Sequence, residues 1–288
     1  QKLIRLLDTS PCSNGLSSGR MGYCFYFYRI GRLLNNPAYG SVAEKILSRL
    51  LSDLKGQKAL DFSNGLSGIG LGINYLIKEK FVDGDVNQVL GDIDDLIFIQ
   101  LGYPQKSQEL SPLHLIHLLI YLGIRLSDQK SGSEQEFLFR ELIVQTVNAL
   151  YDRINPTFFE ELGTFTIDYP LPLFLYALSE IHRHNFYNRR IDKIVSEISP
   201  KVLSSIPALH SNRLYLLWGM KALYKEIPFK DWNNHMSLLV STLDTDRIIT
   251  EELRDRNIFF KDGFTGIYWL ADHIKGCFPD SKISAFKK

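Results

Sequence analysis

A recurring glycine pattern constrains the fold of this chain more than any other feature. The pattern is a pair of glycines three residues apart at the start of an apolar run, and it occurs at Gly19 and Gly22, Gly65 and Gly68, and Gly263 and Gly266. Glycine inside a helix is destabilising by roughly 1 kcal/mol relative to alanine. We therefore expect these glycines to allow the close approach of a neighbouring backbone or of a bound molecule.

Weaker copies of the pattern lie between these three. Apolar runs open near Ser111, Pro170 and Ser211, so that six runs begin near residues 19, 65, 111, 170, 211 and 263, with 41 to 59 residues between neighbours. A period of this length is typical of repeat architectures. We expect each run to form an apolar helix.

A more polar segment follows each apolar run and carries apolar residues at helical spacing. The sequence predicts amphipathic helices at 41–55, 85–100, 134–153, 190–203 and 229–243, with the tail of one more at 2–7. Strict alternation of apolar and polar residues is nowhere long, so no strands are expected. The result is about six helical hairpins, each with an inner apolar helix and an outer amphipathic helix.

Hairpins of this kind form either an open solenoid or a closed ring. Because the inner helices are apolar nearly all round, they suit burial on every side. We therefore predict an all-α fold, an α/α toroid, and one domain over residues 1–288. The polar stretch 127–133 is expected to be a long exposed loop.

Composition excludes several classes of function. The net charge of +1 gives no reason to expect binding to nucleic acid or to an anionic membrane surface. No apolar run is long enough to span a bilayer. Cys12, Cys24 and Cys277 are too scattered for a disulfide framework or a metal cluster, which favours a reducing, cytoplasmic location. Common nucleotide-binding, zinc-protease and serine-hydrolase motifs are absent.

Carboxylates and histidines near the helix starts are the candidate functional groups. Asp61, Asp168 and Asp262 precede inner helices, either as cavity acids and bases of a sugar-processing enzyme or as helix caps. A repeated position favours the cap. His210, at another helix start, is either a catalytic or metal-binding group or a packing residue. His117 shares a helix face with His114 and is expected to pack in the core.

The glycine pair followed by an aliphatic helix resembles the repeat of the lanthionine synthetase C-like (LanC-like) family. The segments 64–76 and 262–270 carry the resemblance best. It implies an α/α toroid and a place in bacterial ribosomal-peptide (lantibiotic-type) modification. Cyclases of that family add cysteine thiols to dehydrated serine or threonine, using a zinc ion held by two cysteines and one histidine.

This chain departs from the family at those ligand positions. With Pro172 aligned, Asp168 stands where the first cysteine belongs, and Leu209, His210 and Ser211 replace a Cys-His-Gly stretch. Zinc needs three or four ligands, and Leu209 cannot bind a metal. The resemblance thus implies Asp168 and His210 as candidate catalytic residues, with no zinc or other cofactor expected.

Three functions remain open from the sequence. The first is a LanC-like protein without zinc-dependent cyclase activity that binds a peptide or protein partner in or near a central cavity. The second is an enzyme of different chemistry, either a six-hairpin glycosidase-like enzyme or a cyclase with a metal site rebuilt from Asp168, His210 and an unidentified third ligand. The third is a structural toroid within a larger chain.

Overall fold

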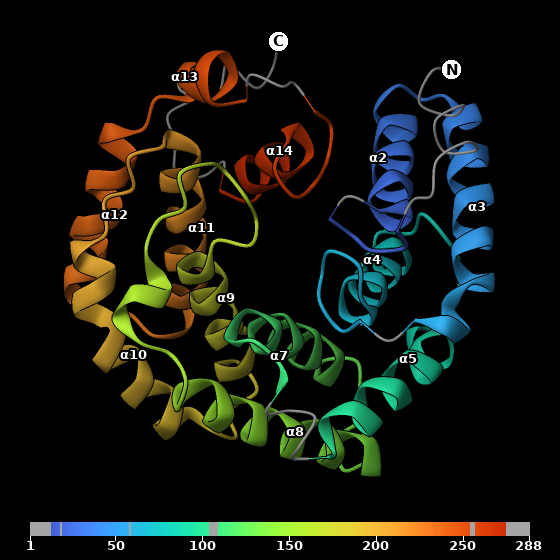
Figure 1. Cartoon of the computed structure of the whole chain (residues 1–288), viewed down its shortest axis with the longest axis horizontal. Coiled ribbons are helices and arrows are strands. Elements are labelled where there is room, and N and C mark those ends of the chain that lie inside the picture. Colours follow the sequence, from blue (N-terminus) through green and yellow to red (C-terminus); the bar gives the residue numbers. More distant parts are fainter. Residues whose placement is uncertain (1–12, 18, 58, 104–108, 254–256, 275–288) are drawn as a thin grey trace. The chain divides into compact units, whose positions relative to one another are not determined.

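The structure is a computed structural model that describes residues 13–17, 19–57, 59–103, 109–253 and 257–274, and these residues contain helices and no strands (Figure 1). The chain divides into two compact units, Gln1–Glu109 and Leu110–Lys288. The helix tail expected at 2–7 lies outside the described residues. One domain over the whole chain stays a prediction.

Unit 1 contains two helical hairpins within its described residues. They are α2 (Arg20–Leu33) with α3 (Pro37–Ser52), and α4 (Leu66–Lys78) with α5 (Val86–Leu101). Helix α2 packs against both α3 and α4, and α4 packs against α5. Helix α3 begins four residues earlier than predicted, because the Asn36 side chain caps it and Pro37 occupies its first position.

Unit 2 continues the alternation. Its helices are α7 (Pro112–Leu126), α8 (Glu134–Tyr151), α9 (Pro170–His182), α10 (Asn188–Ser204), α11 (His210–Glu226), α12 (Lys230–Thr242), α13 (Thr245–Arg247), the π-helical turn η3 (Ile248–Glu252) and α14 (Phe264–His273). Helix α9 packs against α7, α10 and α11, and α11 also packs against α12 and α14. Within this unit, α7, α9 and α11 form an inner layer and α8, α10 and α12 an outer one (Figure 1).

The predicted repeat is confirmed as a series of helices. The residues that precede the first turns of the inner helices are Gly19, Gly65, Ser111, Tyr169, Leu209 and Gly263, each within two residues of its predicted place. The all-α class is confirmed, as is the pairing of inner and outer helices on which the α/α toroid prediction rests. None of the described helices is long and apolar enough to cross a membrane.

The glycine pairs are explained by contact between each helix start and the loop before it. In α4, the Leu66 N–H donates to the Ala59 carbonyl at 2.8 Å, and a Cβ atom added to Gly68 would lie 2.3 Å from the Phe62 oxygen. In the other copies, the N–H of Arg20 donates to the Ser13 carbonyl and the N–H of Phe264 donates to the Asn257 carbonyl. A Cβ atom added to Gly22 or Gly266 would meet the carbonyl oxygen of Leu16 or Phe260, respectively. The backbone that approaches is therefore the motif's own loop, and no bound molecule is needed to account for the glycines.

The aromatic run in α2 belongs to the core of unit 1. Phe25, Phe27 and Tyr28 are buried, and Cys24, which directly precedes them, is fully buried. Burial raises the pKa of the Cys24 thiol to about 12, so this side chain stays protonated and unreactive near neutral pH.

Candidate functional site

Asp168 lies in the loop that leads into α9, and its carboxylate has two basic neighbours. Lys261 Nζ, from the loop before α14, is 3.0 Å from Oδ2, and His117 Nε2, from α7, is 3.4 Å from Oδ1. The Asp168 side chain is 13% exposed and that of His117 is 2% exposed. Asp168 thus joins three segments that are distant in sequence.

The surroundings of Asp168 favour its ionised form. Burial by itself would raise the pKa of Asp168, but the neighbouring His117 and Lys261 outweigh it and hold the pKa below its ordinary value. The same loop is fixed through its backbone, since the Ile167 N–H donates to the Lys261 carbonyl at 2.7 Å. The buried Tyr215 hydroxyl donates to the Ile167 carbonyl, also at 2.7 Å. A buried carboxylate paired in this way is suited to holding loops together.

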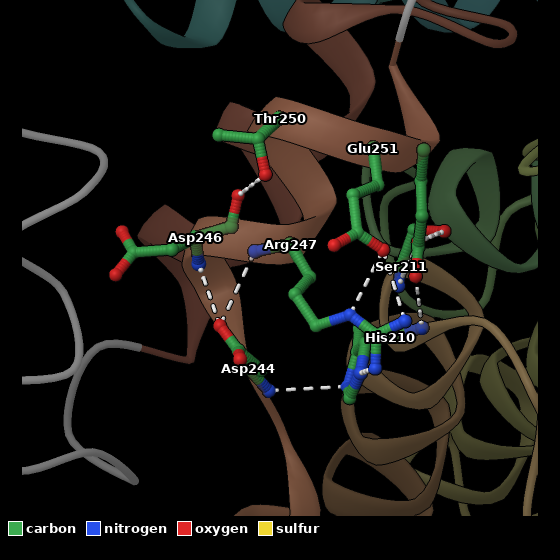
Figure 2. A network of polar contacts seen from close by, with 8 residues as sticks. His210, Ser211, Asp244, Asp246, Arg247, Thr250 and Glu251 are labelled. Carbon is green, nitrogen blue, oxygen red and sulfur yellow. Dashed lines mark hydrogen bonds and ion pairs between the residues drawn. The ribbon is translucent and has the colours of Figure 1, made fainter.

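His210 is the first residue of α11, and its ring lies against the α12–α13 connection, with Asp244 near one ring nitrogen and Arg247 near the other (Figure 2). Nδ1 accepts the backbone N–H of Asp244 at 3.1 Å, and Nε2 is 3.4 Å from Nη1 of Arg247. Burial lowers the pKa of His210, and the positive charges of Arg213 and Arg247 lower it further. The ring is therefore neutral near pH 7 and accepts a hydrogen bond through Nδ1.

Two glutamates from outside the helix cap the start of α11. Glu252, at the end of η3, accepts the N–H groups of His210 and Ser211 at 2.7 and 2.9 Å and the Ser211 hydroxyl at 2.6 Å. Glu161, from the loop before α9, accepts the N–H groups of Ala208 and Leu209 at 2.6 and 3.0 Å. These carboxylates bind the donors that a helix N-terminus leaves unsatisfied, and they complement its dipole.

The two predicted site residues belong to separate networks. Asp168 pairs with His117 and Lys261, whereas His210 contacts the α12–α13 connection, and neither bonds to the other. In the part of the chain that the structure describes, no three histidine, cysteine, aspartate or glutamate side chains are grouped so as to hold a metal ion.

A zinc ion of the kind that the resemblance implies does not fit these residues. Leu209 offers no ligand atom, Nδ1 of His210 is already hydrogen-bonded, and Nε2 faces a guanidinium whose positive charge would repel a cation. Asp168 has an ammonium group as its nearest neighbour.

The expected capping role holds for one aspartate and fails for another. Asp61 accepts the N–H of Asn64 at 2.9 Å, as a turn-forming cap does. Asp168 instead forms ion pairs, because its loop is approached by α7 and by the loop before α14. The expectation that His117 only packs in the core was incomplete, since the ring is buried against a carboxylate.

Comparison of the chain with models of known protein families, with curated proteins and with solved structures found no match. The likeness to the LanC-like family therefore rests on the repeated glycine motif and on His210, which aligns with the histidine ligand of that family.

Sequence reasoning missed four residues of these networks: Glu161, Arg247, Glu252 and Lys261. Lys261 could have been found, because it lies two residues before Gly263 in the third copy of the glycine motif and next to Asp262, the counterpart of Asp168. Glu252 gave no such signal, since it caps a helix that starts some forty residues earlier.

Proposed function

We propose that this chain is a LanC-like protein of bacterial ribosomal-peptide modification that binds a peptide or protein partner and has no zinc-dependent cyclase activity. The repeat of inner and outer helices supports the family likeness. The environment of His210 supports the loss of the cyclase function. We place binding before turnover for such a scaffold, because the contacts of His210 lie within the protein's own structure.

One observation carries this proposal: the histidine at the vestigial ligand position has become part of the protein's own hydrogen-bonding network. Its Nδ1 holds the backbone of Asp244, and its Nε2 lies against Arg247. A catalytic or metal-binding histidine needs at least one nitrogen open to its reactant or metal. His210 supports the turn after α12 instead.

The carboxylates near the helix starts give less support to a sugar hydrolase. Glycosidases need two carboxyl groups roughly 5 to 9.5 Å apart across an open space. Here Glu161 and Glu252 face backbone N–H groups, Asp61 closes a turn, and Asp168 is held by Lys261 and His117. Each of these four carboxylates has a local structural role.

Elemental analysis tests the part of the proposal that concerns zinc. The protein is purified without chelators or a histidine tag, beside the variants Asp168→Ala and His210→Ala. We expect no stoichiometric zinc in any of the three samples. One zinc per chain that is lost in both variants would revive a metal-dependent thiol reaction and overturn the proposal.

Selection from a random peptide library displayed on phage tests the binding role. The bait is the whole chain, immobilised through one terminus, and selected peptides are then measured in solution by fluorescence anisotropy. We expect sequence-related peptides with micromolar affinity. If no peptide is enriched over a bare surface, peptide binding is rejected.

A further inference from the structure

Aromatic side chains from three inner helices of unit 2 meet in one cluster. Trp218 of α11 lies with its ring centroid 4.4 Å from that of Tyr176 on α9 and 5.2 Å from that of Trp269 on α14. Trp218 is 6% exposed, and Trp269 is half-buried and reaches the surface. Tyr176 is half-buried as well, with its hydroxyl below the surface and hydrogen-bonded to Glu180. The cluster therefore has a buried base and an accessible rim.

Two lysines extend this cluster along α11. Lys221 and Lys225 follow Trp218 by three and seven residues, which places all three on one face of the helix. Lys221 is half-buried and Lys225 is exposed. No described carboxylate forms an ion pair with either lysine.

Charged residues at the ends of α9 and α14 have partners of their own. Arg183, at the end of α9, pairs with the buried Glu180. Asp272, on α14, already has a partner. After Trp218, α11 carries Lys221, Lys225 and Glu226, so this end of the helix has a net positive charge that comes from the two lysines.

We propose that this surface, formed by Tyr176, Trp218, Lys221, Lys225 and Trp269 and called the aromatic–lysine face below, binds a peptide that carries aromatic residues next to aspartate or glutamate. Tryptophan and tyrosine supply large, rigid contact areas and dominate many binding interfaces. The lysines complement acidic side chains and select against basic peptides. This inference rests on the proposed binding function and names the chemistry of its partner.

Single-stranded nucleic acid is the other ligand class that combines stacking with positive charge. It is disfavoured here because phosphate-dependent binding needs several cations along a backbone, and the chain as a whole carries a net charge of only +1. A single-stranded oligonucleotide is therefore included as a competitor, and displacement of the peptide by it at equal concentration would overturn the inference.

The experiment uses the peptide library described above and two variants of equal charge change. The variant Lys221→Glu/Lys225→Glu reverses the charge of the aromatic–lysine face. The matched control, Lys193→Glu/Lys230→Glu, changes the same number of charges on the outer helices α10 and α12. Exposed ion pairs change affinity by up to roughly fivefold each. We therefore expect the first variant, which removes two of them, to bind selected peptides about tenfold more weakly and the control to bind within about twofold.

A third variant, Trp269→Ala, tests the aromatic rim. Loss of a central tryptophan weakens binding by about 30-fold at typical hot spots. Because Trp269 also packs against Phe260 and Trp218, its melting curve is recorded beside the binding curve. The lysine variants change only exposed or half-buried side chains, so they are expected to stay folded. They therefore still decide the test if Trp269→Ala unfolds.

The outcomes separate this inference from the proposed function. Enrichment of acidic and aromatic peptides, whose binding is lost in the lysine variant and kept in the control, supports both. If the selected peptides lack this composition, or if both double variants bind them equally well, the inference about the aromatic–lysine face is overturned. Peptide binding itself then still stands. Failure to enrich any peptide overturns both.

Discussion

Removing the Glu252 side chain should destabilise unit 2 far more than removing the side chain next to it. Glu252→Ala deletes the acceptor for the N–H groups of His210 and Ser211 and for the Ser211 hydroxyl. Loss of a helix cap costs about 1 kcal/mol, and a buried hydroxyl left without a partner costs about 1 to 3 kcal/mol. Since the carboxylate is partly exposed and water replaces some of its contacts, we expect a total of about 3 kcal/mol.

Glu251 provides the matched control. It lies beside Glu252 in η3, but its side chain is 50% exposed and its partner is Arg247, four residues earlier (Figure 2). Such a pair contributes about 0.5 kcal/mol at most. Glu252→Gln, which keeps one acceptor oxygen, should fall between the two alanine variants.

Urea unfolding followed by circular dichroism measures the free energy of unfolding of each variant. A loss of about 3 kcal/mol corresponds to a fall in Tm of about 6 to 12 °C for a unit of this size. Hydrogen exchange adds a local measurement, because the amides of His210 and Ser211 should lose protection in Glu252→Ala alone. Equal unfolding midpoints for Glu252→Ala and Glu251→Ala would refute the capping role assigned to Glu252.

Three further predictions concern His210, Asp168 and Gly68. Because the pKa of His210 is lowered in the folded state, the stability due to its neutral ring is fully present above the unfolded pKa near 6.5 and is lost as pH falls below that value. The midpoint of urea unfolding should therefore fall less between pH 7.5 and 5.5 in His210→Gln than in the wild type. An equal fall in both proteins would contradict this. Asp168 has the same sign of pH dependence in a lower pH window, because its folded pKa is also lowered: its stability is present above about pH 4 and is lost as pH falls through the folded pKa. Asp168→Asn should lose about 2 kcal/mol at pH 7 in the same assay, less than a fully buried pair because Lys261 is 37% exposed. The exposed Asp262→Asn should lose under about 0.5 kcal/mol, and a similar loss in both would remove the special role of Asp168. Gly68→Ala should be destabilising by about 2 kcal/mol or more, because the new Cβ would meet the Phe62 carbonyl. A Cβ at Gly91 on α5 meets nothing within 4 Å, so Gly91→Ala should be stabilising by up to about 1 kcal/mol. If the melting temperatures of the two variants shift in the same direction, the packing explanation is contradicted.

The helices could be predicted from the sequence because the signals that define them are local. Gly68 meets the oxygen of Phe62, and Leu66 donates to Ala59, so each copy of the motif is a self-contained unit that a single sequence reveals. The start of α3 was placed too late because Asn36 and Pro37 form a cap before the apolar stripe begins.

The networks around the candidate residues could be predicted only in part. The repeat and the family likeness pointed to Asp168 and His210, but their partners come from other hairpins. Glu252, for example, is 41 residues from Ser211. Nothing in one sequence tells which carboxylate or cation the folded chain brings to a given position, because that depends on how the helices pack.

The contact of Asp168 and Ile167 with Lys261 has a consequence for the order in which unit 2 assembles. The glycine loops close over six or seven residues, whereas this contact joins segments more than ninety residues apart. Long-range contacts form slowly, since a large loop must close before they are made. Ribosomal synthesis also delivers Lys261 after α7 to α12 have emerged. The contact of Asp168 and Ile167 with Lys261 therefore forms only after these helices have been synthesised. In pulsed hydrogen exchange, the Ile167 amide should therefore gain protection later than the Leu66 amide, and simultaneous protection would show that this late closure does not occur.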